Sequence, residues 1–158
     1  MRRHSNRSGK MHGWPCLVVL SFSLLSAVSA CAPHAHKSPF DPRRCMAHTP
    51  REVEGLTIVA GSRTKASIIR DMVPVVCNGQ VLFNRKKIQD PQLKAGTVIF
   101  RVVVEYTGEV IAVNIAETAI QSDAFLRKVS DFIMDTDFVG WARDDIDTVF
   151  LYPVRFGS

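Results

Sequence analysis

Histidine and cysteine side chains are the groups of this chain best suited to nucleophilic, acid–base or metal chemistry. His34, His36 and His48 all lie between residues 31 and 60, and Cys45 lies among them. Imidazole and thiolate suit zinc or copper, although His-x-His and Cys-x-x-His match no common structural zinc site and a solvated linker explains the same residues. Since no histidine follows His48, we expect neither enzyme activity nor a cofactor.

The densest acidic stretch lies late in the chain and suggests a comparison with calcium-binding loops. Such loops alternate oxygen ligands around a glycine and close on a glutamate. Here Asp135 and Asp137 precede Gly140 without a third ligand between them, and no glutamate follows. We therefore expect a helix end and a solvated turn instead of a metal site. The acidic residues of this stretch are Asp131, Asp135, Asp137, Asp144, Asp145 and Asp147.

The first thirty residues have the composition of an export signal. Residues 1–10 carry four basic residues and no acid, and residues 16–30 form an uncharged, mostly apolar run of about 15 residues. A helix that crosses ~30 Å of hydrocarbon needs about 20 residues, so a permanent membrane span is the weaker interpretation. We predict a signal peptide over residues 1–30.

The end of this segment, Val28-Ser29-Ala30-Cys31, resembles a bacterial lipobox. In such a motif a signal peptidase cuts before a cysteine whose sulfur carries a diacylglyceryl group, so Cys31 is the expected lipidation site and mature N-terminus. Ordinary secretory cleavage, with a free thiol left behind, is the alternative. Ala32 in place of aspartate favours an outer-membrane lipoprotein facing the periplasm, with the inner membrane or secretion as alternatives.

The net charge gives little support to nucleic-acid binding. The chain has 20 basic and 15 acidic residues, and loss of the four basic residues of the leader leaves 16 against 15, a charge of +1. Phosphate contacts require a clustered basic surface, so we expect no nucleic-acid partner.

Cys45 and Cys77 are the thiols that remain for the folded protein; an oxidising compartment permits a disulfide between them, and a buried free thiol at Cys77 is the alternative.

Residues 31–60 contain four prolines and no sustained hydrophobic period, so we predict a flexible tether with little fixed structure before Leu56. The folded domain is expected over residues 61–158. Its first helix starts from a cap at Ser62 or Thr64 and ends at Ile88, with a kink or break after Val73 because Pro74 removes a backbone donor.

Alternating β-branched residues predict a hairpin with strands over residues 97–105 and 109–117, and Gly108 supplies the positive φ of its turn. Val98, Phe100, Val102 and Val104 share the first strand's packed face, and Ile111, Val113 and Ile115 should oppose Val110 on the second. A second helix begins at Ser122 or Asp123 and ends near Asp135. A last strand follows over residues 147–156, and Pro153 places it at a sheet edge or strand end. These elements predict an α+β domain, helix-strand-strand-helix-strand, with an antiparallel sheet packed on helices.

The domain resembles the AgmX/PglI-type C-terminal domain, a branch of the TonB-like fold found on bacterial gliding-motility proteins. The resemblance covers about residues 61–156. It departs from the family pattern at Pro74, at Phe83 where tyrosine is usual, and at Asp144-Asp145-Ile146-Asp147 where a basic residue is usual. The matching positions are Gly61 and Arg63; Phe83 and Asn84; Pro91, Leu93 and Gly96; Gly108 and Val110; Ser122, Phe125 and Lys128; Phe138; and Tyr152, Pro153 and Phe156.

The resemblance implies a cofactor-free module of an envelope machine that binds other proteins, with a motility role among the possibilities. TonB-like domains capture an extended segment at an exposed sheet edge. The expected partner-binding residues are Thr148, Val149, Phe150, Leu151 and Tyr152, with the face of Phe125 and Phe132 as a second option. The alternatives are a spacer lipoprotein without a specific partner and a metal-binding tether protein.

Overall fold

The computed structural model describes residues 40–141 and 146–157. Within them the protein is a mixed fold of three helices and one four-stranded antiparallel sheet, which confirms the α+β class. The predicted order of helix, strand, strand, helix and strand is present, and one short helix and one short strand precede it. The elements are α1 (Pro42–Met46), β1 (Thr57–Ala60), α2 (Lys65–Gln89), β2 (Gly96–Val104), β3 (Val110–Thr118), α3 (Asp123–Met134) and β4 (Thr148–Phe156).

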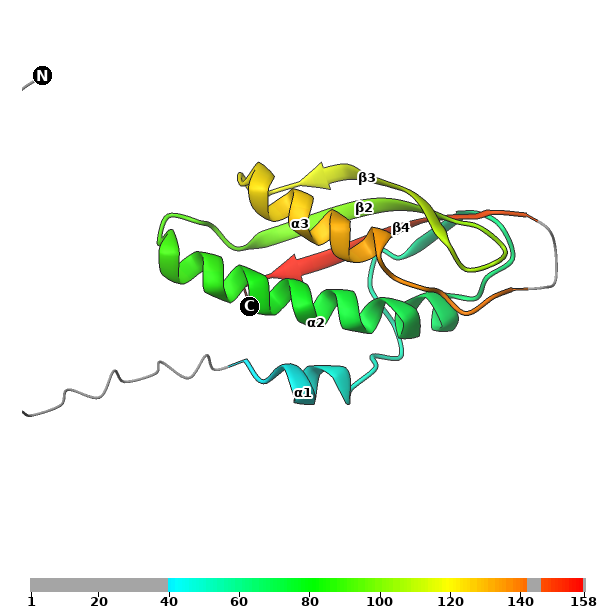
Figure 1. Ribbon diagram of the computed structural model, residues 1–158, viewed down its shortest axis with the longest axis horizontal. Coiled ribbons are helices and arrows are strands. Elements are labelled where there is room, and N and C mark those ends of the chain that lie inside the picture. Colours follow the sequence, from blue (N-terminus) through cyan, green and yellow to red (C-terminus); the bar gives the residue numbers. More distant parts are fainter. Residues whose placement is uncertain (1–39, 142–145, 158) are drawn as a thin grey trace, which may run out of the picture. The chain divides into compact units, whose positions relative to one another are not determined.

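Helices α2 and α3 cover one face of the sheet (Figure 1). The strands lie in the order β1-β4-β2-β3, so β4 is a central strand for part of its length. Alternate residues of β2 and β4 face the helices and are buried, as the period-two pattern predicts for β2. These buried residues are Val98, Phe100, Val102 and Val104 on β2 and Thr148, Phe150, Tyr152, Val154 and Phe156 on β4.

Helix α2 continues through Pro74, so of the predicted kink or break after Val73 the break is wrong. The helix begins where the Thr64 side chain accepts a hydrogen bond from the Ser67 N–H at 3.2 Å, one of the two predicted caps. A proline inside a helix costs about 3 kcal/mol. That cost is offset here because the helix buries an apolar stripe, including Met72, against the rest of the core.

The β2–β3 hairpin is confirmed, with one difference in the faces of β3. Gly108 has φ +108° in its turn, as predicted. A register shift at Val103 and Val104 inserts a bulge, so that Val110 turns inward and Ile111 outward. Val110 is therefore 3% exposed and shares the inner face with the partly buried Val113, while Ile111 is 43% exposed. Strict alternation had placed Val113 with Ile111, on the other face from Val110.

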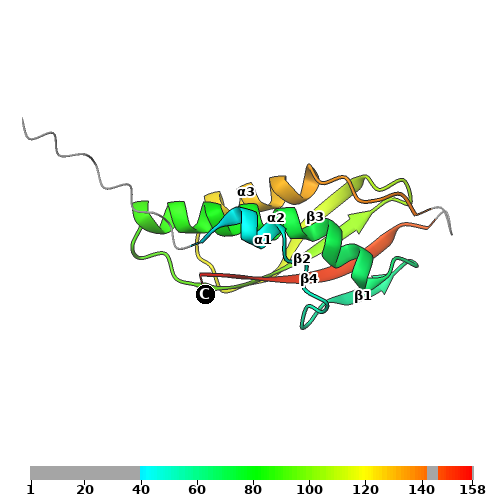
Figure 2. The same cartoon turned by 90° about the horizontal axis from the view of Figure 1, so that it is seen from below.

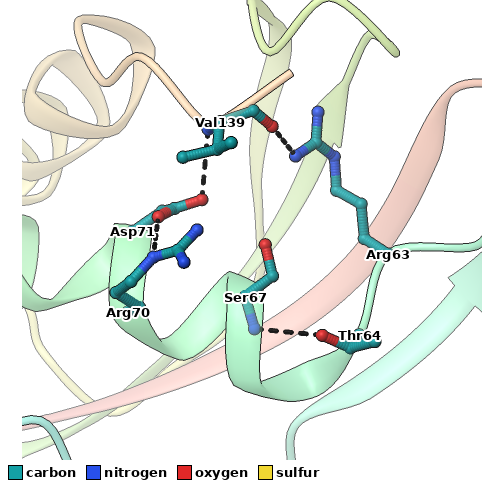
Figure 3. Close-up of polar contacts among 6 residues, drawn as sticks. All are labelled: Arg63, Thr64, Ser67, Arg70, Asp71 and Val139. Carbon is teal, nitrogen blue, oxygen red and sulfur yellow. Dashed lines mark hydrogen bonds and ion pairs between the residues drawn. The ribbon is translucent and has the colours of Figure 1, made fainter. Parts of the chain in front are cut away.

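A buried arginine ties the connection between α3 and β4 to the rest of the domain. Arg63 is 2% exposed and donates hydrogen bonds to the carbonyl oxygens of Val139, at 2.5 Å (Figure 3), and Glu105, at 2.9 Å. The carboxylate of Asp71 accepts from the Val139 N–H at 3.2 Å and from Arg70 Nε at 2.9 Å. Burial lowers the pKa of Arg63, and the nearby Asp71 carboxylate acts against that shift.

Replacing Arg63 tests whether this clamp stabilises the fold. Arg63→Met keeps the aliphatic stem but leaves the carbonyls of Val139 and Glu105 without their donor. Because each buried hydrogen bond from a charged group contributes roughly 1.5–3 kcal/mol, we expect a loss of about 3 kcal/mol in the free energy of unfolding. Urea denaturation followed by circular dichroism measures it.

Arg127→Met is the matched control, because Arg127 is exposed on α3 and takes no part in the Arg63 clamp. It should leave the denaturation midpoint unchanged. Equal midpoints for the Arg63 and Arg127 variants would contradict a structural role for the Arg63 clamp.

Candidate functional site

The directions of the backbone groups along β4 follow from its pairing with β2. In an antiparallel strand, successive residues direct their backbone groups to opposite neighbours. The carbonyl of Thr97 in β2 accepts from the Ala119 N–H at 3.0 Å, on the side of β3, so the next residue, Val98, directs its groups towards β4. Val98 lies opposite Val154. The backbone N–H and C=O of Val154 therefore point towards β2. The backbone groups of the residues on either side of it point away from β2.

Those two residues, Pro153 and Arg155, do not pair with β1, and Gly55, two residues before β1, packs against the Pro153 ring. The pairing of β1 with β4 ends at Thr57 opposite Leu151, and Figure 2 shows β1 beside only one end of β4. The Pro153 nitrogen, which carries no hydrogen, points away from β2. The missing N–H therefore does not interrupt the ladder between β4 and β2. Among the described residues, no backbone group pairs with the outward N–H and C=O of Arg155. We call Pro153–Phe156 the uncovered half of β4.

A groove of about 560 Å³ opens along this uncovered half. Val73 and Val76 of α2 supply apolar side chains to it, and Tyr152 and Val154 contribute from β4. Burial raises the pKa of Tyr152 to about 12. The segment before β1 forms the opposite wall through Phe40, Asp41, Arg44, Cys45, His48, Pro50 and Val53.

A disulfide between Cys45 and Cys77 holds that wall in place. Their Cα atoms lie 5.8 Å apart, and the bond joins α1 to α2. Helix α1 starts with Pro42 at its first turn, and the Asp41 side chain accepts from the Arg43 N–H at 3.0 Å. The expectation of little fixed structure before Leu56 is therefore wrong for residues 42–46. The proline-rich composition that suggested a linker also suits a short helix with proline at its first position.

The charged groups at the groove are mainly basic. The Arg44 side chain is 91% exposed, and its Nε lies 3.6 Å from the Asp41 carboxylate. Arg155 and His48 are also exposed. Within the described residues, no carboxylate forms an ion pair with Arg155. The rim thus offers one free guanidinium beside unpaired backbone groups.

The structure corrects the predicted partner-binding edge. Strand β4 lies between β1 and β2, and Val149, Phe150 and Leu151 pair with both neighbours. Thr148 to Tyr152 is therefore not a sheet edge. Pro153 suggested an edge strand, because proline cannot donate to a ladder. Strand β4 does lack a second neighbour, but only from Pro153 onward. The four-residue β1 was missed because its side chains show no clear alternation of burial.

The second predicted surface, the face of Phe125 and Phe132, belongs to the core. Phe125 is 2% exposed. Its ring centroid lies 5.7 Å from that of Phe83 and 5.0 Å from that of Phe156, and Phe132 is partly buried against the same core. Rings packed edge to face in this way stabilise the domain and leave the Phe125 ring unavailable to a partner, whereas Phe132 also lines a separate hollow beside α2.

The candidate metal ligands separate into different places. Cys45 is bonded to Cys77 and so has no thiolate to offer, while His48 lies at the groove. His34 and His36, and the acidic residues Asp144 and Asp145, lie outside the described residues. Within the described ones, no three His, Cys, Asp or Glu side chains gather closely enough to hold a metal ion.

The predicted signal peptide and the lipidation site Cys31 also lie outside the described residues. None of the helices within residues 40–141 and 146–157 has the length and hydrophobicity needed to cross a bilayer. Comparison with known proteins finds no matching family model, no matching curated protein and no matching solved structure. The groove and its disulfide are therefore interpreted from their own geometry.

The disulfide gives a direct test of how the groove wall is held. Cys45→Ala removes the bond while leaving the buried Cys77 in the core. Because the bond closes a sequence separation of 32 residues, we expect the free energy of unfolding to fall by roughly 2–4 kcal/mol. Amide exchange over residues 40–56 should accelerate while that of β2 stays slow.

Met46→Ala is the matched control, because Met46 is an exposed neighbour on the same short helix. It should change neither quantity. If Cys45→Ala leaves both the unfolding midpoint and the exchange of residues 40–56 at their original values, the disulfide does not hold the wall.

Proposed function

We propose that the chain is an exported, lipid-anchored envelope protein whose folded domain, a TonB-like module of the AgmX/PglI type, docks a protein partner in the groove. The basic leader, the uncharged run after it and the motif ending at Cys31 support export and anchoring. The disulfide adds support, because such bonds persist in oxidising compartments. The element order from α2 to β4 agrees with the family resemblance.

One observation carries the docking proposal: an apolar groove lies against strand backbone that has no partner among the described residues. Most strands at a surface either pair with a neighbouring strand or carry features that prevent pairing, because free N–H and C=O groups accept an added strand. At Arg155 these groups border a space of about 560 Å³ with Val73 and Val76 in its lining. Apolar contact supplies affinity, and backbone pairing fixes the direction of the bound chain.

The disulfide shortens the link between the proposed anchor and the domain. Cys31 and Cys45 are 14 residues apart in the sequence, and Cys45 is fixed to α2. A fully extended chain of that length spans about 50 Å, whereas a free tether of about 25 residues would span about 80 Å. The proposed partner must therefore come within about 50 Å of the membrane, as a component of an envelope-spanning or motility machine would.

Site-specific photo-crosslinking in living cells tests the docking function. A photoreactive residue at Val76, in the groove lining, should yield one abundant crosslinked protein, identified by mass spectrometry. The same residue at Ile88, which lies on the same helix and is 70% exposed, should yield none. The partner band should weaken when Val73 is replaced by Asp, because a charge in the apolar lining opposes docking.

A spacer lipoprotein would behave differently in this experiment. It would give no dominant crosslink at Val76, or equal faint products at Val76 and Ile88. Either result contradicts the docking function. A dominant product only from positions on β3 would move the interaction to the opposite edge of the sheet and exclude the groove.

Mass spectrometry of the mature protein tests the anchor separately. We expect an N-terminal Cys31 carrying a diacylglyceryl group, in a protein that fractionates with membranes. Cys31→Ser should abolish acylation, because only a thiol forms the thioether. The unprocessed chain is then either released from the membrane or retained there by its uncleaved leader. Cys16→Ser is the control and should change neither processing nor fractionation. A mature chain with a free Cys31 thiol would overturn the anchor while leaving the docking proposal intact.

A further inference from the structure

We infer that the groove takes an extended acidic segment of its partner, added as a short strand along the uncovered half of β4, with alternate apolar side chains facing α2 and acidic ones facing Arg155. This inference rests on the proposed docking function and specifies the chemistry of its partner. Three features of the groove support it: the direction of the backbone groups, the length of the open stretch and the charge at the rim.

The backbone geometry favours a strand over a helix as the occupant. The N–H and C=O of Arg155 and the C=O of Pro153 point away from β2, as the register with β2 requires. They form the start of a ladder that β1 occupies farther along, up to Leu151. An extended segment in line with β1 continues the same edge and pairs with these groups, whereas a helix has no free backbone groups to offer.

The open stretch is short and sets the length of the paired segment. At one end β1 stops opposite Leu151. At the other, the Gly157 N–H donates to the side-chain oxygen of Gln80 at 3.4 Å and is already used. Five residues lie between these points, and the four of the uncovered half, Pro153–Phe156, span about 13 Å at ~3.3 Å per residue. About four residues of the partner therefore pair with β4.

The side chains of β4 specify an alternating partner sequence. Tyr152 and Val154 are buried beneath the helices, while Arg155 points to the opposite face and is exposed. In an added strand, residues opposite Val154 share its face and meet the apolar lining at Val73 and Val76, and those opposite Arg155 lie beside its guanidinium. The preferred pattern is apolar-acidic-apolar-acidic.

The positive charge at the groove rim favours an acidic over a basic residue at the second and fourth positions of the bound segment. Arg155 forms no ion pair with the described residues, and Arg44 is 91% exposed with only a 3.6 Å contact to Asp41. A carboxylate that binds at this rim forms an ion pair with Arg155 without breaking an existing ion pair. A lysine there would face the Arg155 guanidinium, a like charge.

A synthetic peptide that alternates valine with glutamate over seven residues is the probe. Its binding to the purified domain is measured by the chemical shifts of Val76 and Val154 amides and by fluorescence anisotropy. We expect binding that weakens as salt increases. A sister peptide with lysine in place of glutamate, and another with its ladder-forming nitrogens methylated, should each bind at least about tenfold more weakly.

Arg155→Glu should weaken binding of the glutamate peptide about tenfold and strengthen binding of the lysine peptide. Arg101→Glu is the matched control: it makes the same charge change on the neighbouring strand β2, at an exposed position outside the groove. It should leave both affinities unchanged. The glutamate peptide should also compete with the partner crosslinked at Val76.

Three results overturn the inference without touching the docking function: equal affinity for the glutamate and lysine peptides, full affinity after backbone methylation, or no peptide binding while the Val76 crosslink persists. Binding of phosphatidylglycerol vesicles to the same rim, abolished by Arg155→Glu and unaffected by the peptide, would assign the basic groups to lipid and would also overturn it. Loss of the Val76 crosslink itself is the separate result that removes the docking function.

Discussion

The burial of five alternate side chains of β4 beneath the helices is the constraint on which the rest of the domain depends. Phe150, Tyr152 and Phe156 are among them, and each large apolar side chain contributes roughly 1.5–3 kcal/mol when buried. A slip of one residue would turn all five towards solvent. The register with β2 is therefore fixed, and with it the direction of every backbone group along β4. Pro153 fits because this register turns its nitrogen away from β2, and the same register leaves the Arg155 backbone facing the groove.

Local patterns were enough to predict most of the fold. The alternation from Val98 to Val104, the turn at Gly108 and the cap at Thr64 each express a preference that neighbouring residues share, and the structure agrees with them. The predictions that failed depend on contacts distant in sequence. Pro74 does not break α2, because burial of the helix outweighs one lost hydrogen bond, and the bulge between Val110 and Ala112 has no signature in the order of its residues.

The candidate site was harder to predict for the same reason. Cys45 and Cys77 were recognised as chemically able to pair, but only the fold brings them together. The edge was assigned to Thr148 to Tyr152 because the sequence does not reveal that β1 lies there. The signal that was present is Gly55 and Gly61, both with positive φ, which bracket the β-branched run of β1 and are typical of strand ends.

The other free edges of the sheet are the reason why we propose the uncovered half of β4 as the docking edge. The outer edge of β1 is four residues long and has a register shift between Ile58 and Ala60. Strand β3 has shifts near both ends, which leave only Ala112–Ile115 in regular register. Bulges twist an edge and interrupt its ladder, and proteins use them to prevent unwanted pairing. The pairing of β4 with β2 has no such shift. Its uncovered half keeps a regular register, faces a groove, and lies beside a wall that the disulfide holds to α2. The two outer edges thus carry irregularities that oppose added strands, and the edge we propose for docking does not.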